Sequence, residues 1–165
     1  MSLDGFIADL DGGYDWIQDV PSPDLDTLHQ MSFDEYLLGV DAVVMGLRCF
    51  EQGQHDDYVQ LGKPVIVAAS RPHRYSADGV EFTDDVLSRV RRERDEGRHC
   101  FLFGGGRLVT SFVTANMVDE LTVGIVPVLL GEGRRLFHEG RGRVDLRLVD
   151  YTILHGRARL TYQRR

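Results

Sequence analysis

The first two thirds of the chain alternate between short apolar runs and amphipathic segments. Near-continuous apolar runs predict buried, parallel strands over residues 40–45, 63–70 and 100–103, with a brief further strand at Val80–Phe82. Apolar residues at helical spacing predict four helices: from the turn signals at 21–24 to Gly39, over 47–51, over about 83–96, and from about 106 to Asn116. This alternation is typical of a parallel sheet flanked by helices.

The last third of the chain contains strand patterns alone. Residues 120–130 form a strand-like run interrupted by Pro127, and residues 146–154 and 157–162 are separated by His155-Gly156, a two-residue hairpin turn. The sequence therefore predicts an α/β fold with one mixed, mainly parallel central sheet, flanking helices and an antiparallel C-terminal hairpin. No repeat or linker is visible, so residues 1–165 are predicted to form a single domain.

Three consecutive glycines follow the apolar run at 100–103. Without a Cβ at Gly104, Gly105 and Gly106, the backbone can turn sharply and approach a bulky ligand closely. The helix that begins there offers free N–H groups and a positive dipole end, which suit a phosphate or pyrophosphate. The alternative is a tight strand-to-helix turn that needs glycine for its geometry alone.

Two other predicted strands end in the same manner, in a small residue followed by arginine. They are Gly46-Leu47-Arg48 and Ser70-Arg71, beside Gly106-Arg107. Ligands of open α/β sheets bind outside the carboxyl ends of the strands, so three such ends predict a long polyanionic ligand. Arginine beside Gly46 and Ser70 favours a 2′-phosphate and hence NADPH over NADH; the alternative for Arg48 and Arg71 is an exposed loop or helix-start arginine.

The known phosphate-binding fingerprints are absent from this sequence. Val109 stands where the dinucleotide motif GxGxxG requires Gly or Ala, and no GK[ST] of a P-loop occurs.

Composition narrows the function classes. The chain has 165 residues, 42% of them apolar, and a net charge of −7, which disfavours a nucleic-acid or anionic-membrane partner. It has neither an apolar stretch of membrane-spanning length nor a signal peptide. Cys49 and Cys100 are expected to be reduced thiols of a cytoplasmic protein, and the scattered histidines predict no metal site.

Several motifs resemble those of the dihydrofolate-reductase-like family that includes the reductase domain of riboflavin biosynthesis, the RibD C-terminal type. They occur in the family's order over nearly the whole chain, at residues 2–8 (SLDGFIA), 11–16 (DGGYDW), 43–51 (VVMGLRCFE), 103–108 (FGGGRL), 118–121 (VDEL) and 127–137 (PVLLGEGRRLF).

The resemblance implies NADPH lying across the strand ends of a mainly parallel sheet. It places the pyrophosphate at the Gly104–Gly106 turn with Arg107 and Leu108, and the nicotinamide at Ile7 and Ala8. The resemblance assigns the adenosine 2′-phosphate side to Gly46, Leu47, Arg48, Cys49, Ala69, Ser70 and Arg71. Family members carry about eight more residues of first strand, so we expect a truncated first strand here.

The reaction implied is hydride transfer to an electron-poor C=N or C=O, with a proton supplied to the heteroatom. The substrate class is a small heterocycle or ribose-linked pyrimidine, as for a 5-amino-6-(5-phosphoribosylamino)uracil reductase. Candidates on the proton side are Asp4 and Asp15, with water relayed past Trp16. The alternatives are a turn-forming Asp4 and a Trp16 that anchors the 9–16 loop.

Other functions stay open. One is a non-catalytic NADP(H)-binding module or sensor, and another is a scaffold domain. A third is dihydrofolate reductase, although none of Asp24, Asp26, Asp34 and Glu35 lies in a recognisable pterin-anchoring motif. A homodimer is expected, since the family is often dimeric. Arg134 and Arg135 could meet a substrate phosphate, but a loop pair at a subunit contact is the simpler interpretation.

Overall fold

The computed structural model describes residues 1–18, 25–27, 32–138 and 142–165. Contacts divide the chain into two compact units, each described here by itself. The inserted unit is the continuous segment Ser32–Met117. The terminal unit combines Met1–Met31 with Val118–Arg165.

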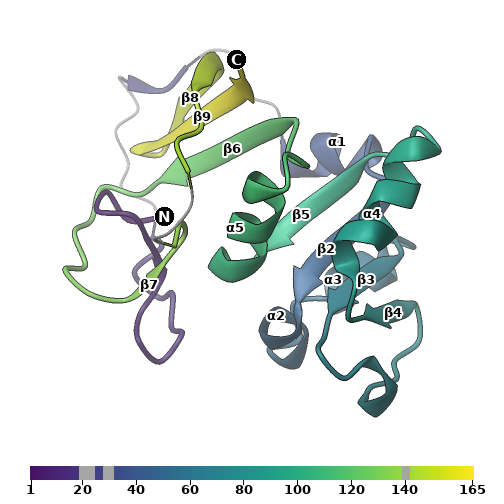
Figure 1. The fold of residues 1–165 in the computed structure, drawn as a ribbon. Coiled ribbons are helices and arrows are strands. Elements are labelled where there is room, and N and C mark those ends of the chain that lie inside the picture. The colour runs from purple at the N-terminus through teal and green to yellow at the C-terminus, as the bar shows by residue number, and fades with distance from the viewer. Residues whose placement is uncertain (19–24, 28–31, 139–141) are drawn as a thin grey trace. The chain divides into compact units, whose positions relative to one another are not determined.

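A four-stranded parallel sheet forms the centre of the inserted unit (Figure 1). Its strands are β2 (Ala42–Gly46), β3 (Val65–Ala68), β4 (Val80–Thr83) and β5 (Cys100–Gly104), in the order β4-β3-β2-β5. Val43, Val44 and Met45 of β2 are fully buried. Strands of a parallel sheet are covered on both faces, which explains why these runs are apolar at successive positions.

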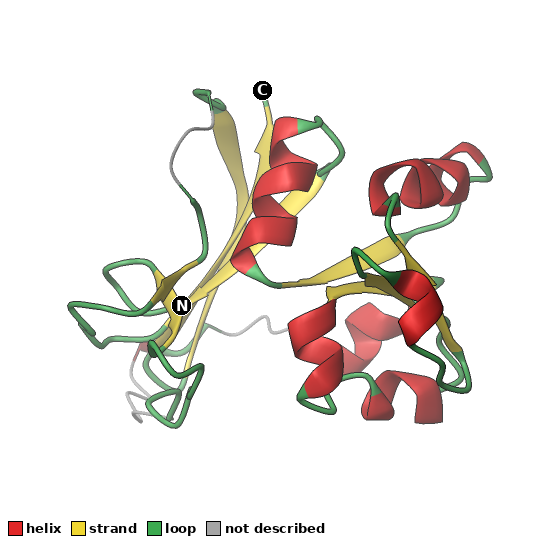
Figure 2. Cartoon of the chain, turned by 60° about the horizontal axis from the view of Figure 1, so that its bottom comes forward, coloured by secondary structure: helices red, strands yellow, loops and turns green. Residues whose placement is uncertain are grey.

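Helices cover both faces of this sheet (Figure 2). The helices α1 (Phe33–Leu38), α2 (Leu47–Glu51) and α3 (Asp56–Gln60) contribute to a core with the alternate residues Val43 and Met45. The helix α4 (Val86–Asp95) contacts β3 and β5. The chain crosses from β2 to β3 in one direction and from β4 to β5 in the other, so right-handed connections place α4 on the opposite face. The helix α5 (Gly106–Thr114) follows β5, and the 3₁₀ turn η2 (Pro72–Arg74) follows β3.

The terminal unit contains an antiparallel sheet in the order β6-β9-β8. Its strands are β6 (Glu120–Ile125), β8 (Leu146–Leu154) and β9 (Arg157–Arg164). His155 and Gly156 both have positive φ, 50° and 72°, which is the geometry of a type I′ hairpin turn. A separate antiparallel pair joins β1 (Phe6–Ala8) to β7 (Arg134–Arg135). The predicted α/β class, the mainly parallel sheet and the C-terminal hairpin are therefore confirmed.

The connection of the strands differs from the prediction of one mixed sheet. Within the described residues, hydrogen bonds group the strands into three sheets. The predicted strand over 120–130 ends at Ile125, before Pro127, because proline cannot donate to a strand ladder. The single-domain prediction and the truncated first strand stay predictions.

The first predicted helix is shorter than expected. It begins at Phe33, since the Ser32 hydroxyl accepts from the backbone N–H of Glu35 while the Glu35 carboxylate accepts from that of Ser32. Thr27 instead lies against β8, where its backbone N–H donates to the Ile153 carbonyl at 3.0 Å. The predicted helix start at 21–24, and with it Asp24, lies outside the described residues. Among the described helices, none has the length and apolar character needed to cross a bilayer.

Candidate nucleotide-binding site

The carboxyl ends of β3, β2 and β5 lie next to one another at one edge of the parallel sheet. Gly46 is in register with Ala68 of β3, and Met45 is in register with Gly104 of β5. A Cβ on Gly46 would lie 3.7 Å from the Gly104 carbonyl oxygen, an ordinary contact. The predicted juxtaposition of the three strand ends is therefore present in the inserted unit.

The glycine turn after β5 has a backbone conformation that other residues rarely adopt. Gly104 has φ 132° and Gly105 has φ 93°. A Cβ at either position would meet nothing within 4 Å, although Gly104 itself is buried and Gly105 is half-buried. Gly105 is the N-cap of α5 and supplies no side-chain hydrogen bond, so no cap side chain satisfies the first-turn N–H groups. A nine-residue helix that begins in this way can accept an anion.

Three exposed arginines accompany these strand ends. They are Arg48, Arg71 and Arg107. Among the described residues, no carboxylate lies within ion-pair distance of any of them. Ser70 is also exposed, whereas Ala69 is buried and its N–H donates to the Thr83 carbonyl at 2.8 Å. This edge therefore combines unpaired positive charge with an exposed residue at Ser70 and a half-buried one at Gly105, whereas Gly104 and Gly106 are buried.

Cys49 connects α2 to the glycine turn. Its thiol donates to the Gly104 carbonyl oxygen over 3.9 Å. Burial raises the pKa of the Cys49 thiol, so this side chain is a neutral donor. Of its neighbours in the candidate site, Leu47 is half-buried, and Leu108 packs inward from α5.

The other predicted site residues belong to the terminal unit. Ile7 and Ala8 are half-buried on β1, and Asp15 is exposed in the loop that follows. Trp16 is half-buried; its Nε1 atom is itself buried and has no hydrogen-bond partner within the described part of the chain. Burying an N–H group without a hydrogen-bond partner costs free energy, so a polar partner at Nε1 would stabilise the Trp16 side chain.

Asp4 is a hydrogen-bond acceptor in a turn. Its carboxylate accepts from the Ser2 hydroxyl at 2.7 Å and from the N–H groups of Leu130 and Gly131 at 3.2 and 2.8 Å. These bonds, the Ser2 hydroxyl first, lower the pKa of Asp4 to about 2. These three hydrogen bonds use the carboxylate within the turn, so the geometry favours the turn-forming alternative for Asp4.

The arginine pair lies in strand β7. Arg134 donates to the Leu10 carbonyl, and the Arg135 guanidinium carbon lies 4.6 Å from the centre of the Phe6 ring. Both side chains thus have partners within the terminal unit, which the sequence did not indicate because a two-residue strand has no periodicity.

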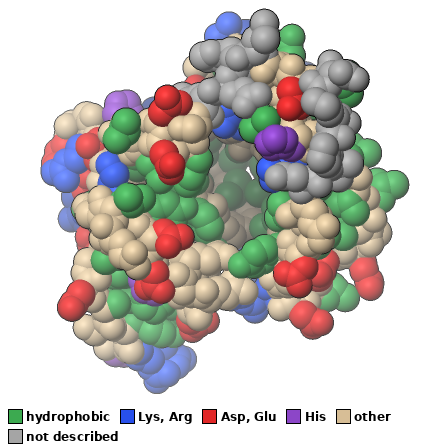
Figure 3. All heavy atoms as spheres, turned by 180° about the vertical axis from the view of Figure 1, so that it is seen from behind, with side chains coloured by type: hydrophobic (Ala, Val, Ile, Leu, Met, Phe, Trp, Pro, Cys, Tyr) green, Lys and Arg blue, Asp and Glu red, His purple; other side chains and the backbone are tan. Residues whose placement is uncertain are grey.

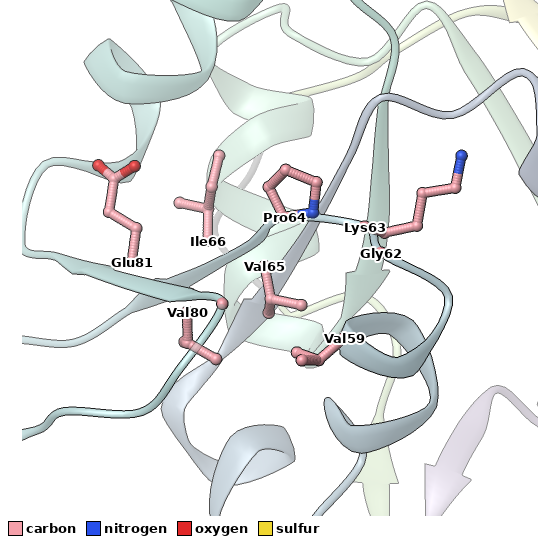
Figure 4. Close-up of a pocket in the computed structure, with 9 residues that line it drawn as sticks. Val59, Gly62, Lys63, Pro64, Val65, Ile66, Val80 and Glu81 are labelled. Atoms are coloured by element: carbon pink, nitrogen blue, oxygen red, sulfur yellow. The ribbon is translucent and has the colours of Figure 1, made fainter.

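A shallow pocket lies at the opposite edge of the parallel sheet, at the amino ends of β3 and β4 (Figure 4). It has a volume of about 500 Å³ and is lined mainly by apolar side chains, among them Val59, Pro64 and Val80. Its two charged groups have protein partners, because Lys63 donates to the Val40 carbonyl and Glu81 pairs with Arg89. The pocket therefore offers no free charge for a phosphorylated ligand.

The described residues contain no group of three or more His, Cys, Asp or Glu side chains that could hold a metal ion. On the face seen in Figure 3, acidic and basic side chains are interspersed among apolar and neutral ones.

Comparison with solved structures relates the whole chain to riboflavin-biosynthesis proteins. A putative riboflavin biosynthesis protein from Shewanella sp. PV-4 matches with a TM-score of 0.80 and 25% identity, covering 100% of this chain and 95% of that one. A Thermotoga maritima diaminohydroxyphosphoribosylaminopyrimidine deaminase/5-amino-6-(5-phosphoribosylamino)uracil reductase has the same fold, with a TM-score of 0.72 at 16% identity. That match covers 99% of this chain and 54% of the bifunctional protein.

Two curated proteins of Bacillus subtilis (strain 168) are similar in sequence. The chain is 29% identical to the uncharacterized protein YyaP, over 91% of this chain and 83% of YyaP. It is 28% identical to the uncharacterized protein YwjB, over 90% of this chain and 84% of YwjB. The sequence model of the RibD C-terminal domain family matches residues 1–157. With this match over nearly its full length, the chain belongs to the family of RibD C-terminal domains.

Proposed function

We propose that the chain is an NADPH-dependent reductase that transfers a hydride to a small heterocyclic or ribose-linked substrate. The observation that carries the proposal is the alignment of three strand ends, one of which opens into the uncapped turn at Gly104–Gly106. The Thermotoga maritima protein of the same fold is named as a uracil reductase, which supports the reaction class. The substrate we propose is of the 5-amino-6-(5-phosphoribosylamino)uracil type.

The inserted unit would hold the phosphates of the nucleotide. Gly104–Gly106, with Arg107 and Leu108, would bind the pyrophosphate, because backbone N–H groups and a helix start suit an anion. Gly46–Cys49 and Ala69–Arg71 would bind the adenosine 2′-phosphate, for which the unpaired guanidinium groups of Arg48 and Arg71 provide a planar fork. The exposed arginines of both sets fit the charge of a phosphorylated dinucleotide, and no side chain fills the space beside Gly104 and Gly105.

The residues proposed for the reacting end of the cofactor are Ile7, Ala8, Asp15 and Trp16. Bound NADPH provides the hydride, and Ile7 and Ala8 would form the wall for its nicotinamide. Since the Asp4 carboxylate already accepts three hydrogen bonds within the turn, we propose that the exposed Asp15 orients the water that is relayed past Trp16 and supplies the proton. The unpartnered Nε1 atom of Trp16 supports a polar partner at this ring.

Nucleotide binding is tested by titration and thermal unfolding. Trp16 is the only tryptophan, so its fluorescence reports binding directly. A ligand at 100 times its Kd adds about 2.7 kcal/mol to the free energy of unfolding, and we expect this stabilisation at lower concentrations of NADPH than of NADH. The absence of a shift with either nucleotide would contradict the proposal.

Turnover separates a reductase from a non-catalytic NADP(H)-binding module. We expect NADPH oxidation with members of a panel of carbonyl and imine heterocycles, including ribose-linked pyrimidines. Binding without oxidation of NADPH by any of them would favour the module.

We also propose a homodimer and a cytoplasmic location. Strand β8 presents the exposed apolar side chains Leu146, Leu148, Val149 and Tyr151, which a second copy could cover. Light scattering should then give a dimer for the wild type and a monomer for Leu148→Arg. Cys49 and Cys100 are free thiols, which supports a reducing compartment.

A further inference from the structure

The chain leaves β1 through a tight turn that leads to Asp15 and Trp16. The N–H of Asp9 donates to the Gly13 carbonyl at 2.9 Å, and the N–H of Gly12 donates to the Asp9 carbonyl at 3.0 Å. Gly12 has φ 100°, so it needs a conformation that other residues rarely adopt. We call residues 9–13 the Asp9–Gly13 turn.

Arg134 closes this turn from the neighbouring strand. Its Nε and Nη2 atoms both donate to the Leu10 carbonyl oxygen, at 3.1 and 2.9 Å. The pairing of β7 with β1 sets Arg134 opposite Ala8, the last residue before the turn. The guanidinium group thus reaches a carbonyl that the backbone bonds within the turn do not use.

Gly12 makes room for that guanidinium group. A Cβ on Gly12 would lie 2.4 Å from the Nη1 atom of Arg134 and 3.0 Å from its Cζ atom. The glycine and the arginine are therefore matched in shape as well as through the hydrogen bonds to Leu10.

We infer that Arg134 is a positioning residue, which holds the Asp9–Gly13 turn and thereby fixes the path of the chain from β1 to Asp15 and Trp16. A lysine reproduces this arrangement only in part: its ammonium group can donate to the Leu10 oxygen, but it lacks the planar guanidinium that places two N–H groups on that oxygen and packs against Gly12. The effect of this positioning on hydride transfer rests on the proposed function, whereas the effect on the loop does not.

The loop is tested without any ligand, through the accessibility of the only tryptophan to acrylamide. In Arg134→Lys and Arg134→Ala, we expect the quenching constant of Trp16 to rise about twofold as the loop opens locally. Arg135→Lys is the matched control, since Arg135 is the next residue of the same strand and lies over Phe6 instead. Unchanged quenching in both Arg134 variants would overturn the inference.

A second route to the same effect uses Gly12. Its replacement by alanine should push the guanidinium group away from Leu10 and raise Trp16 quenching while Arg134 is still present. The increase should shrink in the Arg134→Ala background, where nothing is displaced. Gly97→Ala controls for backbone strain, because Gly97 also has positive φ but open space around it. Equal increases in both backgrounds would contradict the inference.

Steady-state kinetics give the readout that a purely structural role would not move. Arg134→Lys should lower kcat for NADPH oxidation about tenfold, because misplaced catalytic groups reduce the rate, and leave the Kd of NADPH unchanged. An equal loss of NADPH affinity would contradict positioning. If the wild type oxidises no NADPH, the proposed function fails, and the quenching experiments still decide the role of Arg134.

Discussion

At the scale of single residues, Asp4 illustrates a carboxylate used for structure. The Ser2 hydroxyl that donates to Asp4 also accepts from the N–H of Phe6 at 2.9 Å, and Ser2 is fully buried. Asp4 in turn accepts from Leu130 and Gly131, more than a hundred positions along the chain. One side chain therefore connects the start of β1 to the segment before β7.

The pKa of Asp4 predicts the pH dependence of this connection. Its folded-state pKa is about 2, against an ordinary value of 3.8, so its stabilisation is present above about pH 4 and is lost as the pH falls toward 2. In Asp4→Asn, we expect a lower unfolding temperature than the wild type at pH 7 and a difference that has shrunk to a small part of that at pH 2.

The control for Asp4 is an exposed aspartate of the following loop. Asp11→Asn should leave the unfolding temperature unchanged at both pH values. A difference between wild type and Asp4→Asn that is as large at pH 2 as at pH 7 would contradict the assignment of Asp4 as an ionised acceptor.

At the scale of elements, the start of α1 depends on the reciprocal bonds between Ser32 and Glu35. Ser32→Ala removes the acceptor for a helix N–H, so we expect a loss of about 1 kcal/mol in the free energy of unfolding. Denaturant titration measures it. Ser76→Ala, an exposed serine outside any helix, should change the free energy by less than about 0.5 kcal/mol; equal effects would contradict the capping role.

The turn after β5 allows a matched test of backbone approach. Gly105→Val and Gly62→Val both place a branched side chain at positive φ with open space around it, so both should lose about 1–3 kcal/mol of stability. Only Gly105→Val should weaken NADPH binding, by at least about tenfold, since only Gly105 faces the proposed pyrophosphate. Equal NADPH affinities in the two variants would contradict that assignment.

The elements could be predicted where local pattern decides them. The buried runs of β2, β3 and β5 and the His155-Gly156 turn follow from composition and spacing alone, as does the alignment of the strand ends. The motif Ser32-x-x-Glu35 was also present in the sequence, but the apolar spacing from Leu25 onward suggested an earlier helix start. The pairing of Thr27 with Ile153 depends on distant residues, and no local signal contains it.

The residues of the candidate site, like the elements, could be predicted only where a local pattern indicates them. The glycines and arginines of the strand ends could be found from the sequence, because parallel strands bring their carboxyl ends to one edge. The state of Asp4 and the contact of Arg134 with Leu10 could not, because both depend on partners more than a hundred positions away.

At the scale of the whole molecule, the inserted unit is one continuous segment, whereas the terminal unit combines two segments. The buried cluster around Val43, Met45 and Val65 is made entirely of residues from the inserted unit. We therefore expect the excised segment Ser32–Met117 to unfold cooperatively by circular dichroism, as an autonomous folding unit does. Gradual unfolding would contradict this, and Met45→Ala, which removes a fully buried side chain, should abolish the transition.

The terminal unit is made of two chain segments that are far apart in the sequence, and this has a consequence for biosynthesis. Ser2 bridges to Val126, and Phe6 pairs with Arg135, so Ser2 and Phe6 leave the ribosome long before their partners exist. At 5–20 residues per second, this interval is on the order of ten seconds. The whole inserted unit is synthesised during that interval, so the nascent chain must carry β1 without its partner strand until β7 has been made.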